Sequence, residues 1–176
     1  MSQMRMGTEL RTLGALLISS ILVGPSFAQA LPGSCPVDRK TLSKHSYQAI
    51  RQRAIVGEMR GIAEAIECFG AEHHGYPAPT ASLIPLSQVQ TDLVPRYQLF
   101  IPTSDAWGSD YLFWSNGVHY VLISTSGDVA QDRDYGSLLG GEWSHAKASI
   151  CRGVTDNPEQ DLVFVDGQFC SWLRDK

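Results

Sequence analysis

The sequence is poor in clustered positive charge. Its 176 residues include 14 Lys and Arg against 18 Asp and Glu, a formal net charge of −4, and no basic run is longer than two residues. Nucleic acids and anionic membrane surfaces bind proteins through clustered positive charge, which displaces their counterions. Neither is therefore expected as a partner. Hydrophobic residues make up 43% of the chain, and the mean hydropathy is −0.10, which excludes a disordered chain and a polytopic membrane protein.

The motifs that hold a phosphate or expose a nucleophile in common enzymes are also missing. The sequence contains no GxxxxGK(S/T) loop, no GxGxxG segment and no GxSxG nucleophile elbow, each of which has a defined chemical task. The cysteines form no CxxC pair, the spacing typical of zinc and redox sites. No catalytic residue is predicted, and the chain is not expected to be an enzyme.

The first 30 residues have the composition of a cleavable signal peptide. Two arginines precede an apolar run at 13–23, and small residues (AQA) at 28–30 provide a cleavage site. Cleavage after Ala30 would leave residues 31–176 as a single exported domain. We expect this domain to be periplasmic or extracellular and to have no stable membrane insertion.

All four cysteines belong to the exported part, and an even number in an oxidising compartment favours disulfides. A long helix before Cys68 would place this residue far from Cys35 unless the intervening chain were almost fully extended. The Cys151–Cys170 pair is favoured because it closes a loop of moderate length. The pairing of the other two cysteines stays open.

A long amphipathic helix is predicted to begin between Thr41 and Ser46. Apolar residues recur at steps of four and three, and charged residues lie largely on the other faces. The helix should end near residues 74–77 (HGYP), since Gly and a nearby Pro stop helices. The apolar positions are Ile55, Met59, Ile62, Ile66 and Phe69.

A β-hairpin is predicted from residues 111–114 to 118–124, because Asn116-Gly117 supplies the positive φ angles of a tight turn. A two-residue loop there would place Phe113 opposite Tyr120.

A second β-hairpin is predicted from residues 162–165 to 168–170, with its turn at Asp166-Gly167. A short helix is expected near residues 86–93. Residues 126–160 show only weak periodicity. A segment of this length without evident secondary structure indicates either a mistaken assignment or a functional loop that something holds in place.

This loop is rich in carboxylates, and three features could hold it: the disulfide, Trp143 as an apolar anchor, or a bound cation. Calcium suits a flexible loop because it takes six to eight oxygen ligands, main-chain carbonyls included. The acidic residues are Asp128, Asp132, Asp134, Asp156, Glu159 and Asp161.

Four passages of the sequence, in this order, resemble the major pseudopilins of type II secretion systems. Residues 65–69 (AIECF) and 75–77 (GYP) resemble the family's A-I-E-x-Y and G-x-Y-P. Residues 102–111 (PTSDAWGSDY) resemble P-x-D-P-W-G-x-x-Y, with Ala in place of the second Pro. Residues 120–128 (YVLISTSGD) resemble the strand and loop that end in S-x-G-x-D, with the glycine shifted by one position, and Asp161-Leu162 resembles the D-I that follows.

The resemblance implies a pilin-like α+β fold, in which one long N-terminal helix packs on a small antiparallel sheet, with a calcium-binding loop. The longer loop of this chain, with its two cysteines, has no counterpart in the family, and we expect calcium and the Cys151–Cys170 disulfide to hold it. It implies a calcium site to which Ser124, Asp128 and Asp161 contribute. It also implies that the partners are other envelope or secretion-system proteins.

The N-terminus departs from the family. Gly7-Thr8 imitates a prepilin cleavage site, but Thr12 stands where the family has Glu, and Arg11 interrupts the apolar run. Prolines prevent one continuous helix into residue 46: Pro25, Pro32 and Pro36.

We therefore expect an exported, non-catalytic, pseudopilin-like protein without the prepilin anchor helix, an accessory of type II secretion. The alternative is a small secreted hydrolase or a ligand-binding module with its site in loop 126–160.

Overall fold

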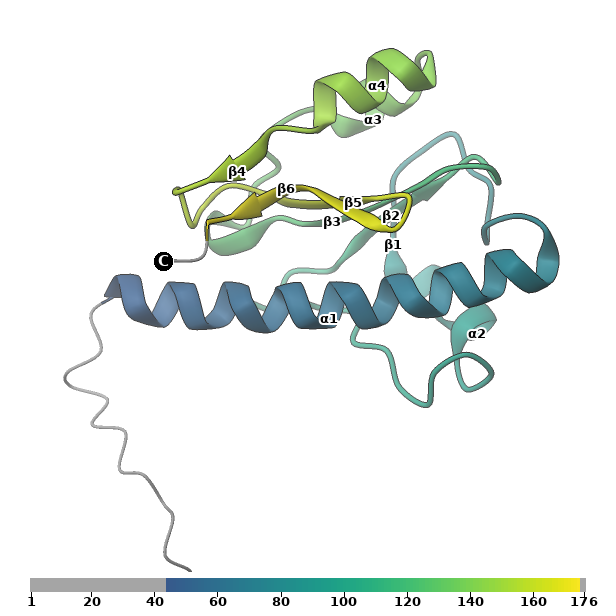
Figure 1. Cartoon of the computed structure of the whole chain (residues 1–176), viewed down its shortest axis with the longest axis horizontal. Helices are drawn as coiled ribbons and strands as arrows, with labels where there is room; N and C mark the ends of the chain where they lie inside the picture. The colour runs from purple at the N-terminus through teal and green to yellow at the C-terminus, as the bar shows by residue number, and fades with distance from the viewer. Residues whose placement is uncertain (1–43, 175–176) are drawn as a thin grey trace, which may run out of the picture. The chain divides into compact units, whose positions relative to one another are not determined.

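The computed structural model describes residues 44–174, which fold as a mixed α+β unit in which a long helix packs on a six-stranded sheet (Figure 1). Residues 1–43 lie outside the described residues. The signal peptide, its cleavage after Ala30 and the state of Cys35 therefore stay predictions. Within the described range, no helix is both long enough and apolar enough to cross a membrane.

The helix α1 (Lys44–His73) confirms the predicted amphipathic helix. Its 30 residues contain no proline, and at 1.5 Å per residue they extend about 45 Å. The helix ends where His74 takes a left-handed conformation (φ 57°). The predicted apolar stripe packs on the sheet, with the first four members fully buried and the last one partly: Ile55, Met59, Ile62, Ile66 and Phe69.

The strands form one sheet in the order β1-β2-β3-β5-β6-β4. Neighbouring strands are antiparallel, except that β4 and β6 run parallel at one edge. The strand bounds are Ile84–Pro85 (β1), Leu112–Ser115 (β2), Tyr120–Ser124 (β3), Gly153–Thr155 (β4), Leu162–Val165 (β5) and Gln168–Leu173 (β6).

Two further predictions are confirmed. The β5–β6 hairpin turns at Asp166 and Gly167, whose φ angles of 47° and 83° suit a tight turn. The short helical segment near 86–93 consists of a 3-10 turn, Leu86–Gln88, followed by α2 (Gln90–Leu93).

The predicted register of the first hairpin is wrong by two residues. Phe113 lies opposite Leu122, and Ser115 lies opposite Tyr120. The loop is longer than two residues because the Asn116 side-chain oxygen accepts hydrogen bonds from the main-chain N–H groups of the second and third residues after it, at 3.0 and 2.7 Å. This side-chain turn competes with the two-residue turn. Because the shift is even, each side chain keeps its predicted face.

The prediction that residues 126–160 lack regular structure is also wrong. They contain a 3-10 turn, Ser126–Asp128, then α3 (Tyr135–Leu139), α4 (Trp143–Ile150) and β4. Helices of five and eight residues are too short to show a clear hydrophobic period. Local capping and packing stabilise them, as where the carboxylate of Asp134, which precedes α3, accepts a hydrogen bond from the N–H of Ser137 (3.0 Å).

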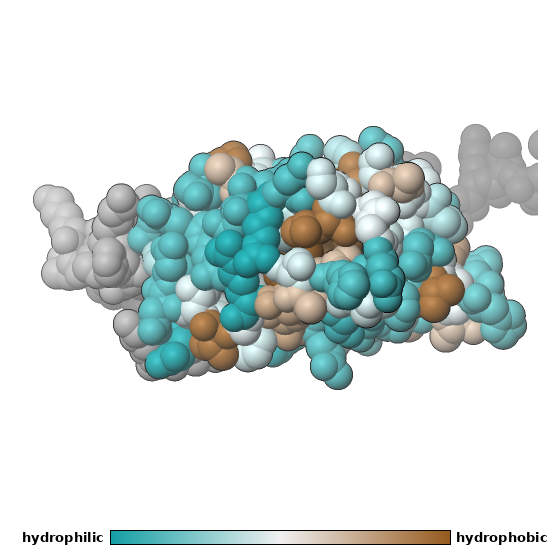
Figure 2. All heavy atoms as spheres, turned by 90° about the horizontal axis from the view of Figure 1, so that it is seen from above, coloured by the Kyte–Doolittle hydropathy of each residue, from teal (hydrophilic) through white to brown (hydrophobic). Residues whose placement is uncertain are grey.

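The central strands β3 and β5 are buried along their whole length because both faces of the sheet are covered. Tyr120 and Leu122 pack on the side of α1, and Val121 and Ile123 pack on the opposite side with α3 and α4. Figure 2, seen from the side of α3 and α4, shows a mostly hydrophilic surface in which hydrophobic atoms gather in a central recess.

The Cys151–Cys170 disulfide is confirmed, with the two Cα atoms 4.8 Å apart. It joins the residue that follows α4 to strand β6, so it ties the inserted segment to the sheet. Cys68 is exposed on α1 and has no disulfide partner among residues 44–174.

The packing of α1 predicts unequal effects for two isoleucines of this helix. Ile62 is fully buried and Ile50 is 52% exposed. Ile62→Ala should lower the free energy of unfolding by about 2–5 kcal/mol, whereas Ile50→Ala should change it by no more than about 0.5 kcal/mol. Urea unfolding of both variants measures this, and equal losses would contradict the burial of the stripe.

Candidate functional site

The three predicted metal ligands lie near one end of the sheet. Ser124 is the last residue of β3 and pairs with Leu162 of β5, so Asp161 is a close neighbour of this strand end. Asp128 ends the 3-10 turn that follows β3 and is exposed. The fold thus gathers in space residues that are up to 37 positions apart in the sequence.

The hydroxyl group of Ser124 is engaged by a carboxylate that the metal prediction did not include. It donates a 2.7 Å hydrogen bond to Oδ2 of Asp105, which is 6% exposed. The other oxygen of Asp105 accepts hydrogen bonds from the main-chain N–H groups of Trp107 (2.9 Å) and Ser109 (3.0 Å). Asp105 therefore has a full set of donors, and it connects the loop before β2 to the end of β3.

Asp161 is hydrogen-bonded through only one of its two carboxylate oxygens. Its Oδ2 atom accepts hydrogen bonds from the Tyr135 hydroxyl (2.7 Å) and the Asp132 N–H (2.8 Å), while Oδ1 is buried and has no hydrogen-bond partner among the described residues. The Asp132 carboxylate accepts in return from the Asp161 N–H (3.0 Å) and lies 3.7 Å from Arg152. This reciprocal pair joins the loop before α3 to the start of β5.

Burial raises the pKa of the Asp161 carboxyl to about 6, and the neighbouring negative charges of Asp132 and Asp128 act in the same direction. The hydrogen bonds from Tyr135 and Asp132 oppose this rise because they stabilise the charged form. Burial, with the Asp161 charge next to it, also raises the pKa of Tyr135. An ionised Asp161 is therefore costly to the fold unless positive charge is supplied.

Two further oxygen atoms near the end of β3 lack partners. Like Asp161 Oδ1, the hydroxyl oxygens of Thr125 and Ser126, which follow β3, are buried without hydrogen-bond partners among the described residues. Calcium accepts such neutral oxygens together with carboxylates. Among residues 44–174, however, no group of three or more His, Cys, Asp or Glu side chains is arranged to hold a metal. Calcium therefore stays a prediction, with Asp161 as its best-placed ligand.

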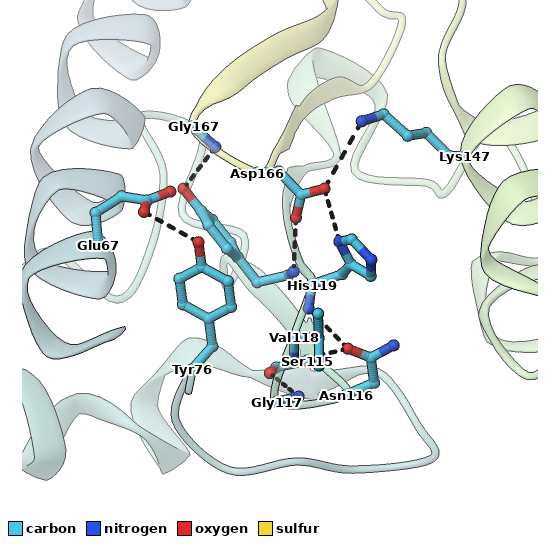
Figure 3. Close-up of polar contacts among 11 residues, drawn as sticks. Glu67, Tyr76, Ser115, Asn116, Gly117, Val118, His119, Lys147, Asp166 and Gly167 are labelled. Atoms are coloured by element: carbon cyan, nitrogen blue, oxygen red, sulfur yellow. Dashed lines mark hydrogen bonds and ion pairs between the residues drawn. The ribbon is translucent and has the colours of Figure 1, made fainter. Parts of the chain in front are cut away.

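A second polar cluster lies at the opposite end of β3, around the turn between β5 and β6. Figure 3 shows the Asp166 carboxylate between the Lys147 ammonium and the His119 ring. The distances are 3.7 Å to Lys147 and 3.0 Å to Nδ1 of His119, and the other carboxylate oxygen accepts from the Tyr120 N–H at 3.1 Å. Asp166 thus connects the turn, strand β3 and helix α4.

His119 is held by stacking as well as by Asp166. Its ring lies 4.5 Å from that of Trp143, which stacks on Trp114 at 5.6 Å. In the described part of the chain, no Ser, Thr or Cys side chain hydrogen-bonds to this ring. The stacking on Trp143 and the contacts of Asp166 attach α4 to the sheet.

The Gly-Tyr-Pro passage lies at this second end. The Tyr76 N–H donates to the carbonyl of Gly117 in the hairpin loop (2.9 Å), and its hydroxyl donates to Glu67 of α1 (3.0 Å; Figure 3). Burial and the Glu67 carboxylate raise the pKa of Tyr76 to about 12. Tyr76 therefore couples the end of α1 to the first hairpin.

Sequence reasoning missed two residues of the Asp161 end as functional candidates. Asp105 lies inside the passage that resembles P-x-D-P-W-G, so its place in that motif was an available signal. Tyr135 had no such signal. Asp132 was among the acidic residues of the loop, but only the fold shows that it pairs with Asp161.

Comparison of this chain with protein-family models, with curated proteins and with solved structures finds no match.

The raised pKa of Asp161 predicts a pH dependence in the absence of metal. The unfolded carboxyl has its ordinary pKa of 3.8, and the folded one titrates near 6. Its stabilising contribution is therefore complete below about pH 4 and is lost as the pH rises through 6. In chelator, wild type should lose up to about 3 kcal/mol of unfolding free energy over this range relative to Asp161→Asn, since one pKa unit corresponds to about 1.4 kcal/mol.

Urea unfolding at four pH values between 4 and 7 measures this difference. Asp92→Asn, which alters an exposed aspartate on α2, is the matched control and should follow wild type. If Asp161→Asn also follows wild type, the carboxyl titrates at its ordinary pKa.

Proposed function

We propose that this chain is an exported, non-catalytic, pilin-like protein that binds other envelope proteins as an accessory of type II secretion. The observation that carries the proposal is the meeting, at one end of the sheet, of three of the passages that resemble major pseudopilins. Asp105 bonds to Ser124, Asp161 precedes the strand that pairs with Ser124, and the Trp107 ring lies beside Gly127, 3.6 Å from where a Cβ on this glycine would be.

A calcium ion near Asp161 is part of the proposal. The unpartnered Oδ1 atom and the raised pKa of Asp161 support it, because a cation would remove the cost of burying this charge. The role of calcium would be structural, since Asp161, Asp132 and Tyr135 join three segments of the chain that the ion would hold in place.

The proposed location is the periplasm or the extracellular space. The Cys151–Cys170 disulfide supports it, since disulfides persist in oxidising compartments. The formal charge of −4 favours protein partners over nucleic acids.

Thermal melting of the exported chain in calcium and in chelator tests the metal site. At about 100 times its dissociation constant, calcium should add about 2.7 kcal/mol, a rise of several degrees in Tm. Asp128→Ala and Asp161→Ala should abolish the rise, and Asp92→Ala should keep it. The rise should also shrink below about pH 6, where protons compete for Asp161. An unchanged Tm in wild type would refute the calcium site.

Cross-linking in intact cells that carry a type II secretion apparatus tests the partner class. An amine-reactive reagent should link the exported chain to components of this apparatus, identified by mass spectrometry. The control is a chain that begins at residue 31 and stays in the cytoplasm, where no such links should form. Links to unrelated proteins only, or hydrolysis of ester, glycoside or phosphate substrates by the purified chain, would contradict the proposal.

A further inference from the structure

Arg152 lies beside the carboxylate pair that joins the inserted segment to the sheet. Its Nη1 atom is 3.7 Å from Oδ2 of Asp132, and the same oxygen accepts the hydrogen bond from the Asp161 N–H at 3.0 Å. One atom of Asp132 thus contacts both the guanidinium and the main chain of Asp161. Because an arginine is always charged, the Asp132–Asp161 pair has a permanent positive charge at its edge.

The fold fixes the main chain of Arg152 on both sides. Cys151, directly before it, is joined to β6 by the disulfide. Gly153, directly after it, begins β4 and pairs with Ser171 of β6. The Ser171 hydroxyl also donates to the Asp161 carbonyl at 3.0 Å. The segments that carry Arg152 and Asp161 are therefore attached to the same strand, which sets the position of the arginine relative to the carboxylate pair.

Negative charge predominates around this pair. Asp132 and Asp128 both act on Asp161 as neighbouring negative charges. Asp161 is itself 1% exposed, and its Oδ1 atom has no hydrogen-bond partner among the described residues. Arg152 is the cation that pairs with Asp132, and Arg133, the residue after Asp132, is a second cation of this region. Buried carboxylates are costly without such compensating charge.

This ion pair is expected to affect a bound cation more than it affects stability. The side chains of Arg152 and Asp132 are 39% and 22% exposed, and solvent screens ion pairs of this kind, so the pair contributes little to stability. A divalent ion carries twice the charge of a side chain and is repelled by the guanidinium at short range. The arginine that compensates the carboxylates in the metal-free protein therefore opposes metal binding.

We propose that Arg152 is the internal cation of the Asp132–Asp161 pair and that it lowers the affinity of this site for a divalent cation. The inference rests on the proposed calcium site and names the residue that sets its affinity. Calcium binds only at a concentration that overcomes the repulsion by the guanidinium. Arg152 thus sets the calcium concentration above which loop 126–160 gains additional stability.

Isothermal titration of the metal-free exported chain with calcium chloride tests the proposal. Arg152→Gln should lower the Kd for calcium by about tenfold, because it removes a positive charge next to the ion. Arg152→Lys keeps this charge and should stay within about threefold of wild type. Arg174→Gln is the matched control. It removes an arginine that lies at the same distance, 3.7 Å, from another carboxylate, Asp156, and it should leave the Kd unchanged.

Two further measurements separate electrostatic repulsion from a structural role of Arg152. In about 1 M salt, where the Debye length is about 3 Å, the difference in Kd between wild type and Arg152→Gln should shrink. Thermal melting in chelator confirms that each variant is folded. In saturating calcium, the rise in Tm should be larger for Arg152→Gln than for wild type by a few degrees.

Three results would overturn the inference. If calcium binds wild type and Arg152→Gln equally, or binds the variant more weakly, the inference fails and the calcium site stands. If Arg174→Gln tightens binding as much as Arg152→Gln does, the effect belongs to the net charge of the chain. If neither wild type nor Arg152→Gln binds calcium, the calcium site of the proposed function fails together with the inference, so the two failures are distinguishable.

Discussion

The packing of α1 against β3 and β5 is the constraint on which the rest of the structure depends. The helix buries its isoleucine stripe on one face of the sheet, and α3 and α4 cover the other. Both faces of the central strands are therefore dry, and each buried apolar side chain there contributes roughly 1.5–3 kcal/mol. Polar chemistry is excluded from the middle of the sheet, so it concentrates at the two strand ends, around Asp161 and around Asp166.

The buried carboxylates at the Asp161 end illustrate how hydrogen bonding decides what burial costs. Asp105 and Asp161 are both almost fully buried, yet Asp105 accepts three hydrogen bonds on its two oxygens, whereas Asp161 has one oxygen without a partner. Leaving a buried polar atom unpaired costs about 1–3 kcal/mol. This contrast explains why a bound cation should lower the energetic cost of burying the Asp161 carboxylate, and not that of Asp105.

A groove of about 1240 Å³ between α1 and the β5–β6 part of the sheet has its origin in the same packing. A straight helix can follow a twisted sheet closely only over part of its length, because successive strands rotate away from it. Here α1 is packed on β3 and β5, while the groove opens toward the β6 side, where Phe169 and Trp172 are only partly buried. The groove is thus a consequence of the geometry that forms the core.

Local patterns in the sequence were sufficient for α1, the β5–β6 hairpin and the Cys151–Cys170 pair, because each depends on periodicity, turn residues or loop length within one segment. The register of the first hairpin was not determined in this way, since the Asn116 side chain competes with the turn that its Asn-Gly dipeptide favours.

What the sequence by itself determined is the α+β class with its long helix and the Cys151–Cys170 disulfide. It also named Asp161 as a metal ligand, which stays a prediction. The helices of residues 126–160, the contacts of Asp161 with Tyr135 and Asp132, and the groove beside α1 were decided only by the tertiary structure. The physical reason is that they depend on contacts between segments far apart in the chain. Such contacts produce no hydrophobic periodicity in the sequence of either segment.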